Sequence, residues 1–382
     1  MAIGVFGLQV AYKLKRLEVM STDDTHGWFG GGSTSTTVST VDRIDFSNDT
    51  GTANIRGSLS AAKQRLAATG NSNYGWFGGG FNPGGGFPGL STVDRIDFSN
   101  DSSTASPRSP LSSARYALAA TGNSNYGWFG GGAIPTPAVV STVNRIDFSN
   151  DSSTASIRGS LSLARLNLAS TGNSNYGWFG GGYIPTPAVV SRVDRIDFSN
   201  DLASASPRGP LNIQRQQLAA TGNSNYGWFG ATSSVGTTNI DRTDFSNDAV
   251  SALVRGLLSS SRYRGAATGN SNYGWFGGGA TPTLISTVDR IDFSNDLATA
   301  SPRGSLSLAR SGLAATSGQA KGPAIKLQKA GNYGWFGGGF IPASTATVER
   351  INFSNDSSTA SVRGPLSSVR FSLAATSNTH IG

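Results

Sequence analysis

The most regular feature of the chain is a short segment in which aromatic residues and glycines mix. The segment Tyr-Gly-Trp-Phe-Gly-Gly occurs seven times, with His26 replacing the tyrosine in the first copy and Ala231 the second glycine in the fifth. Aromatic side chains on both faces and glycines that admit neighbouring backbone predict a short buried strand. The seven copies contain every tryptophan of the protein, namely Trp28, Trp76, Trp128, Trp178, Trp228, Trp275 and Trp335.

The spacing of these tryptophans indicates a repeat protein. Successive positions differ by 48, 52, 50, 50, 47 and 60 residues. A nearly fixed period indicates one structural unit for each repeat. After each aromatic strand comes a variable loop, and then a segment such as 92–98, in which apolar and polar residues alternate as in a half-buried strand.

Two further strands complete each repeat. A polar turn, Ser-Asn-Asp, leads to a third segment that carries proline in three copies, at Pro107, Pro207 and Pro302. Proline lacks a backbone donor, so this segment fits an outer edge strand. A segment such as 116–121 then leads through the turn Gly-Asn-Ser-Asn into the next aromatic strand.

Four antiparallel strands in each of seven repeats predict an all-β, seven-bladed β-propeller. We expect an N-terminal arm over residues 1–24 and a propeller over 25–382, with a basic insert at 317–330. The first repeat has no innermost strand of its own, and residues 370–377 form such a strand with no repeat behind it. The C-terminal strand is therefore expected to complete blade 1, and deleting Phe371–Gly382 should open the ring.

These residues resemble the kelch repeat. The glycine pair that ends the second strand, the aromatic residue before it and the arginine before the first strand are similar to that family, although tryptophan here adjoins the glycine pair. A propeller of the chromosome-condensation-regulator type is the alternative, but its Gly-Gln-Leu-Gly motif does not occur. The repeated Ser-Thr-Val-Asp-Arg-Ile-Asp-Phe-Ser-Asn-Asp also looks like repeat propellers encoded by tailed phages of marine bacteria. That resemblance implies a structural protein of a phage particle.

The formal net charge of +8 raises the question of nucleic-acid binding. Most arginines belong to three columns that recur in every repeat, beside columns of aspartate. The last of these columns is Arg65, Arg115, Arg165, Arg215, Arg262, Arg310 and Arg370. Because the basic residues do not form a stripe, no specific nucleic-acid partner is expected. No apolar run is long enough for membrane insertion.

Candidate catalytic and metal-binding residues are few. The chain has no cysteine and two histidines, His26 and His380, which do not form a cluster with metal-ligand spacing. We therefore expect no enzyme activity and no cofactor. The aspartates of the Ser-Asn-Asp turns could bind calcium, although turn formation explains them more simply. The Arg and Asp of Val-Asp-Arg-Ile-Asp are expected to form ion pairs between blades.

The loops after the glycine pair differ most between repeats, and they are partly apolar. Because strands alternate in direction, the loops between strands 2 and 3 (2–3 loops) share one face of the ring with the 4–1 loops, and the 1–2 and 3–4 loops share the other. We predict that the first face binds a ligand through Phe81, Ile134, Tyr183 and Phe340.

The opposite face receives the segments that break the repeat. The N-terminal arm contains Val5, Phe6, Leu8 and Val10, and the insert contains Lys321, Lys326 and Lys329. We predict that these residues dock the propeller onto other virion structural proteins. The expected function is a non-enzymatic structural and adhesion protein of a phage tail or fibre, located in the virion, that contacts a host-surface glycan or protein. The alternative is a cytoplasmic kelch-type adaptor that binds a protein.

Overall fold

The computed structural model describes residues 25–85, 89–136, 138–186, 188–232 and 237–317, together with the backbone of strands at 333–341, 343–352, 361–363 and 376–377. The chain forms two compact units, Met1–Pro323 and Ala324–Gly382. In its described part, regular structure consists of strands and four 3₁₀ turns, Pro83–Gly85, Phe98–Asn100, Phe198–Asn200 and Phe293–Asn295. No helix among the described residues is long and apolar enough to cross a membrane.

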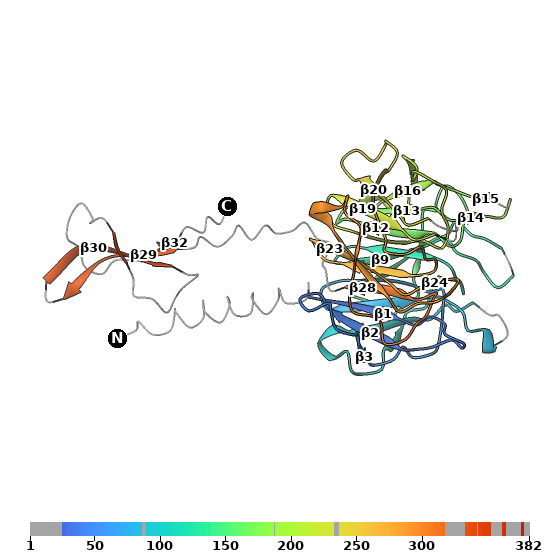
Figure 1. Ribbon diagram of the computed structural model, residues 1–382, viewed down its shortest axis with the longest axis horizontal. Helices are drawn as coiled ribbons and strands as arrows, with labels where there is room; N and C mark the ends of the chain where they lie inside the picture. The colour runs from blue at the N-terminus through green and yellow to red at the C-terminus, as the bar shows by residue number, and fades with distance from the viewer. Residues whose placement is uncertain are drawn as a thin grey trace. The chain divides into compact units, whose positions relative to one another are not determined.

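The described residues of the first unit form a propeller of six four-stranded antiparallel blades (Figure 1). Blade 1 contains β28(Ala314–Ser317), β1(His26–Gly30), β2(Val41–Asp45) and β3(Asn54–Arg56), and blade 2 contains β4(Ala67–Gly70), β5(Tyr74–Gly78), β6(Val93–Asp97) and β7(Ser106–Arg108). Blade 3 contains β8(Ala119–Gly122), β9(Tyr126–Gly130), β10(Val143–Asp147) and β11(Ser156–Arg158), and blade 4 contains β12(Ala169–Gly172), β13(Tyr176–Gly180), β16(Val193–Asp197) and β17(Ser206–Arg208). Blade 5 contains β18(Ala219–Gly222), β19(Tyr226–Gly230), β20(Asn239–Asp244) and β21(Leu253–Leu257), and blade 6 contains β22(Ala266–Gly269), β23(Tyr273–Gly277), β26(Val288–Asp292) and β27(Ser301–Pro302).

Two of the 2–3 loops contain hairpins of their own. These are β14(Tyr183–Ile184) with β15(Ala188–Val189) in blade 4, and β24(Ala280–Thr281) with β25(Thr283–Leu284) in blade 6. Both hairpins lie on the same side of the propeller in Figure 1. The 2–3 loops therefore share one face, as the alternation of strand direction predicts.

The ring closes differently from the sequence prediction. β28 pairs with β1 in the register Trp28↔Thr316, which matches Trp76↔Thr69 within blade 2. The closing strand of blade 1 thus comes from the end of the sixth repeat, and the prediction of a C-terminal closing strand and seven blades in one ring was wrong. The physical reason is that residues 313–317 already provide an innermost strand, and no Gly-Asn-Ser-Asn turn follows it.

The seventh repeat forms a separate four-stranded sheet. Its strands are β29(Tyr333–Ile341), β30(Ala343–Asn352), β31(Ser361–Arg363) and β32(Thr376–Ser377), in the order β31-β30-β29-β32. The pairing Trp335↔Thr376 repeats the register of the ring blades. The C-terminal strand therefore completes the sheet of its own repeat.

The tryptophan of each blade joins that blade to the next one. Trp178 stacks on Phe245 of blade 5 with ring centroids 3.8 Å apart, and its Nε1 donates to Oδ2 of Asp248 at 2.8 Å. The side chain is fully buried. The same two contacts recur at every junction, including the closing one, where Trp275 of blade 6 stacks on Phe46 and donates to Asp49 of blade 1.

The glycine at the end of the aromatic strand lets the next blade approach. A Cβ on Gly130 would lie 2.8 Å from Cε1 of Phe179, which belongs to blade 4. Phe179 itself is fully buried and packs with Trp128 in one core cluster. The apolar core of the ring is thus a series of clusters between blades, each formed by the aromatic residues of two neighbours.

Trp178→Ala should destabilise the protein strongly because it removes the stacking on Phe245 and leaves a cavity between blades 4 and 5. We expect a loss of about 3–5 kcal/mol in the free energy of unfolding, measured by guanidinium denaturation. Ile157→Ala is the matched control, since Ile157 is 63% exposed on an outer strand and should change stability by less than about 0.5 kcal/mol. Equal midpoints for the two variants would contradict the packing described above.

Truncation tests the closure. A chain ending at Pro323 keeps β28 and should melt at the same temperature as the ring of the full chain. A chain ending at Gly312 lacks β28, exposes the edge of β1 and should aggregate or melt earlier. Thermal unfolding and gel filtration measure both. If the two truncated chains behaved alike, β28 would not be the strand that closes the ring.

Candidate functional site

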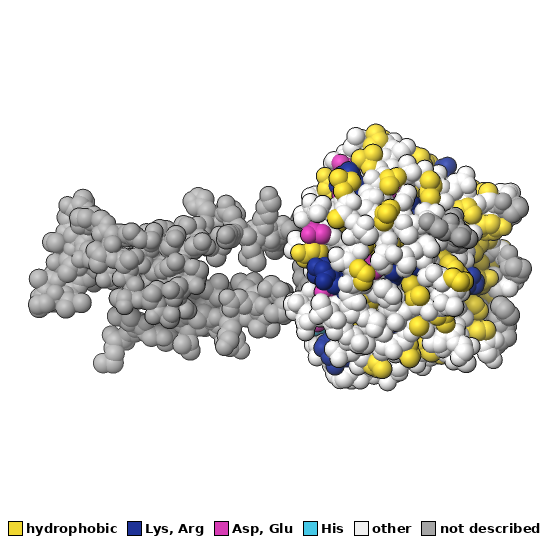
Figure 2. Space-filling view, viewed as in Figure 1, with side chains coloured by type: hydrophobic (Ala, Val, Ile, Leu, Met, Phe, Trp, Pro, Cys, Tyr) yellow, Lys and Arg dark blue, Asp and Glu magenta, His cyan; other side chains and the backbone are white. Residues whose placement is uncertain are grey.

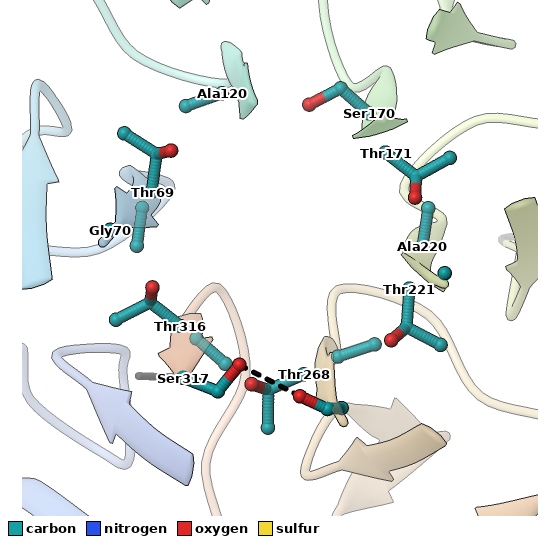
Figure 3. A pocket seen from close by; sticks show the side chains of 15 residues that line it. Thr69, Gly70, Ala120, Ser170, Thr171, Ala220, Thr221, Thr268, Thr316 and Ser317 are labelled. Carbon is teal, nitrogen blue, oxygen red and sulfur yellow. Dashed lines mark hydrogen bonds between the residues drawn. The ribbon is translucent and has the colours of Figure 1, made fainter. Parts of the chain in front are cut away.

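A cavity lies on the axis of the ring. It has a volume of about 60 Å³ and is lined by fifteen residues of the innermost strands β4, β8, β12, β18, β22 and β28 (Figure 3). Alanine, glycine, threonine and serine make up the whole lining. Residues such as Gly70 and Ser317 end their strands, so the cavity lies toward the face that carries the 1–2 turns.

Hydroxyl groups give this cavity its chemistry. The Oγ1 atoms of Thr171 and Thr268 and the Oγ of Ser170 are buried without a protein hydrogen-bond partner. Ser317, at the position where the neighbouring strands have glycine, donates from Oγ to the carbonyl of Gly269 at 2.8 Å. A buried water needs about 10–15 Å³ of such volume and several polar partners. The cavity therefore suits a few water molecules and is too small for a sugar or a nucleotide.

The aspartates of the Ser-Asn-Asp turns serve the junctions between blades. Oδ2 of Asp248 accepts from Trp178 and from Nη1 of Arg195 at 3.1 Å, and Arg208 lies 3.6 Å away. The carboxylate is therefore engaged by cationic and indole donors across the junction between blades. Of the Arg and Asp of Val-Asp-Arg-Ile-Asp that were expected to form such pairs, Arg195 does, whereas Asp197 accepts from Ser199 in its own turn. Among the described residues, no group of three or more His, Cys, Asp or Glu side chains could hold a metal ion.

A second ionic contact lies deeper, between each 4–1 segment and the next blade. In blade 4, Arg165 Nη2 lies 3.0 Å from Oδ2 of Asp194, and both side chains are fully buried. The equivalent cation in blade 2 is Lys63, whose Nζ lies 3.1 Å from Asp94, and not Arg65 as the column of arginines predicted. The prediction was wrong because Lys63, four residues after Leu59, replaces the arginine that follows the matching leucine in other repeats.

Burial shifts the pKa of these cations. Removal from water lowers the pKa of Arg165 to about 10 despite the nearby Asp194, and burial lowers the pKa of Lys63 while Asp94 opposes the shift. Blade 3 differs because its partner position holds Asn144. There burial lowers the pKa of Arg115 to about 10, and Asn144 Oδ1 accepts from Arg115 Nη2 at 2.7 Å.

On the opposite end of the axis from the cavity, the backbone itself forms a closed ring. One residue per blade, two positions before the innermost strand begins, has a positive φ between 53° and 69°. The N–H of each donates to the carbonyl of its counterpart in the preceding blade at 2.6–2.9 Å, and Arg65 closes the circle by donating to Gly312. We call these residues the variable ring, and they are Arg65, Ala117, Asn167, Gln217, Arg264 and Gly312.

The side chains of the variable ring differ in charge, size and hydrogen-bonding groups. They include two cations, two carboxamides, one methyl group and one hydrogen atom, although the backbone is the same in all six. By contrast the 1–2 turn at the opposite face reads Gly-Asn-Ser-Asn-Tyr in every described blade whose two inner strands it joins. We call the end of the propeller with the variable ring, the 4–1 segments and the 2–3 loops the variable face.

The 2–3 loops contact the variable ring through the residues just before it. Phe81 bridges to Gln64, and Tyr183 to Leu166. Phe81 is only 7% exposed, so its ring supports the face from below, whereas Ile134 and Tyr183 are partly exposed. Phe340 lies in β29 of the second unit, outside the residues whose side chains are described. A role for these residues in ligand binding stays a prediction.

The predicted docking residues of the arm and the insert, from Val5 to Val10 and from Lys321 to Lys329, lie outside the described residues.

His26 occupies the tyrosine position, and its ring centroid lies 5.9 Å from that of Trp28, close to the 5.8 Å between Tyr74 and Trp76. In Figure 2 apolar side chains are scattered in small groups over the visible surface of the propeller.

No protein-family model matches this chain, and no curated protein matches it. The sequence reasoning missed the variable ring because its residues lie in a linker, two positions before the strand, where the residue type follows no pattern between repeats. The sequence feature that could have revealed the ring is the contrast between these differing residues and the constant segment after them, which begins Leu-Ala-Ala-Thr in four of the six repeats.

Asn144→Asp should stabilise the propeller. The variant supplies Arg115 with the carboxylate that the other described blades provide at this position, and the free energy of unfolding should rise by about 1–3 kcal/mol. The reverse change in the next blade, Asp194→Asn, is the matched control and should lower stability by a similar amount. Denaturant unfolding at neutral pH measures both. A loss of stability in Asn144→Asp would show that the blade 3 junction is built for a neutral partner.

Proposed function

We propose that this protein is a non-enzymatic structural and adhesion protein of a phage particle, in which the variable face of the propeller binds a molecule on the host surface. The observation that carries the proposal is the variable ring. Six backbone positions of similar conformation carry arginine, alanine, asparagine, glutamine and glycine around one axis, whereas the 1–2 turns that join the inner strands at the other end read Gly-Asn-Ser-Asn in every described blade that has one.

Packing alone does not explain this distribution of variation. The residues that join the blades, such as Trp178 and Asp248, are the same in every junction because each has the same neighbours. The larger residues of the variable ring are partly exposed at the centre of a rigid scaffold and lie outside those junction contacts, and binding residues of many folds lie at such positions. Variation around the axis at this end, while the 1–2 turns around the axis at the other end stay constant, favours a surface selected for recognition.

The rigidity of the ring also favours recognition. Each residue of the variable ring is held by a backbone hydrogen bond on either side, so its side chain starts from a fixed point. Binding then costs little ordering of the backbone. The proposal that the protein belongs to a phage particle rests on the resemblance of the repeats to propellers of tailed phages. A cellular adaptor would use the same face for a protein partner, and the experiments below separate the two.

The face assignment can be tested with single cysteines, because the chain has none of its own. Thr136→Cys lies in the 2–3 loop of blade 3, and Ser124→Cys lies in the 1–2 turn of the same blade; both positions are exposed. Each variant is coupled to a polyethylene glycol chain and tested for binding to a panel of marine bacterial cells. We expect the label at Thr136 to block binding and the label at Ser124 to leave it intact. The reverse pattern would place the binding surface on the other face.

Association with a particle needs a separate measurement. Mass spectrometry and gel filtration should find the protein in purified phage particles and not in the soluble fraction of the lysate. Recovery only as a soluble complex with a cellular protein would favour the adaptor.

A further inference from the structure

Two arginines of the variable ring differ from the other arginines of the propeller. Arg65 and Arg264 belong to blades 2 and 6, and Gly312 of blade 1 lies between them in the ring of hydrogen bonds. Of the arginines in the described part of the chain, these two and Arg115 make no salt bridge. Arg115 is instead satisfied by backbone carbonyls and Asn144.

Arg65 is incompletely satisfied by the protein. Its Nε is buried and has no hydrogen-bond partner. Burial lowers the pKa of Arg65, and the positive charge of Arg264, the next arginine around the variable ring, lowers it further. Two half-buried cations without a carboxylate are unfavourable unless an anion joins them.

The acidic residues of the ring do not supply that anion. The aspartates nearest this end, such as Asp42 and Asp94, are fully buried and already paired with Arg310 and Lys63. The partly exposed aspartates end the third strand of a blade, as Asp45 ends β2 in blade 1, and so lie at the opposite face. The variable face therefore has two unpaired positive charges that no described carboxylate neutralises.

Aromatic rings and carboxamides surround the two cations. The guanidinium carbon of Arg65 lies 5.3 Å from the ring centroid of Phe81, whose ring is 5.2 Å from that of Tyr116, and the guanidinium carbon of Arg264 lies 5.6 Å from the ring of Tyr263. With its amide oxygen turned toward Arg264, Gln217 accepts from Nη2 and Nε at 3.1 and 3.2 Å. This contact orients Arg264 and leaves its charge uncompensated.

We propose that Arg65 and Arg264 bind the carboxylate of an acidic saccharide over Gly312. The planar forks of two guanidinium groups match a carboxylate. The carboxamide nitrogen of Gln217 can bond a sugar hydroxyl, and the partly exposed tyrosines offer flat apolar surface to a sugar ring. Gly312 lies between the two arginines in the ring of hydrogen bonds and adds no side chain there. This inference rests on the proposed function and names the class of ligand.

A nucleic acid fits the observations less well. Its affinity comes from many phosphate contacts along a strand, whereas the variable face has two unpaired cations and the remaining described arginines are engaged within the ring. A ligand with one or a few carboxylates needs no more than the pair.

The test measures binding of a hexuronic acid oligosaccharide to the full chain by isothermal titration calorimetry. Arg65→Gln and Arg264→Gln should each weaken binding by at least about tenfold. Both variants should fold, because Gln217 adopts the same backbone conformation with φ 57°. Asn167→Ala, on the far side of the ring from Gly312, is the control that keeps both charges; Ala117 shows that alanine fits, and binding should fall by much less.

Gly312→Asp provides a second readout. It places a tethered carboxylate between the two arginines, and aspartate tolerates a positive φ better than most residues. We expect the variant to lose affinity for the oligosaccharide and to keep or raise the melting temperature of the ring. Retained affinity in this variant, or in both Arg→Gln variants, would overturn the proposal.

Control ligands test whether the carboxylate is the group that the two arginines recognise. A neutral oligosaccharide of the same length should not bind; equal binding would overturn the role of the carboxylate. Stronger binding of a sulfated oligosaccharide, or of single-stranded DNA, with the same dependence on Arg65 and Arg264 would overturn the assignment to a carboxylate saccharide. If the label at Thr136 blocks cell binding but the Arg→Gln variants bind cells normally, this inference fails while the proposed function stands. If the oligosaccharide binds as expected but no cell does, the proposed function fails instead.

Discussion

The architecture depends on one contact, the docking of a tryptophan from each blade onto the phenylalanine and aspartate of the next. A single four-stranded sheet has two faces and cannot bury both by itself. Trp178 donates its Nε1 hydrogen bond to Asp248 and stacks its ring on Phe245, and both partners lie in the following blade. Stability is therefore a property of neighbours, and the ring has no free junction because Trp275 finds Asp49 and Phe46 across the closure.

This dependence explains why the blade was predictable and the number of blades in the ring was not. Strand order and the alternation of buried positions follow from local pattern, and the strands lie where they were expected. The ion pairs between blades were predicted only in part, because Arg195 pairs with the turn residue Asp248 while Asp197 serves its own turn. Closure is a competition between two nearly identical strands. Leu313–Ser317 and Leu373–Ser377 both read Leu-Ala-Ala-Thr-Ser, while the innermost strands that continue into a tight turn end in glycine. The longer spacing before Trp335 showed where the ring ends, but period alone does not say which strand pairs with β1.

The candidate site was predicted only in part. Strand parity placed the variable loops on one face, and Tyr183 and Ile134 lie there with partly exposed side chains. The ring that now carries the functional proposal was hidden by a misaligned column, because Arg65 looked like the buried cation that is in fact Lys63. A sequence column can report that arginine recurs, but it cannot distinguish an arginine paired with an inner aspartate from a partly buried one that lies two residues later and has no carboxylate partner. Burial and the partner decide that difference, and both require coordinates.

The positive φ at the variable ring links the backbone to the freedom of the side chains. Each residue there donates to one neighbour and accepts from the other through backbone atoms alone, so no side chain takes part in closing the circle. Arginine, asparagine, alanine and glycine can then occupy equivalent positions at a modest conformational cost, which is least for glycine and asparagine. The residues that hold the blades together lack this freedom, since a change at one junction removes a partner from the next blade. A propeller of nearly identical repeats can thus keep one fold while its axial face changes, and this separation is the reason for proposing that the variable ring, more than the apolar loops around it, encodes specificity.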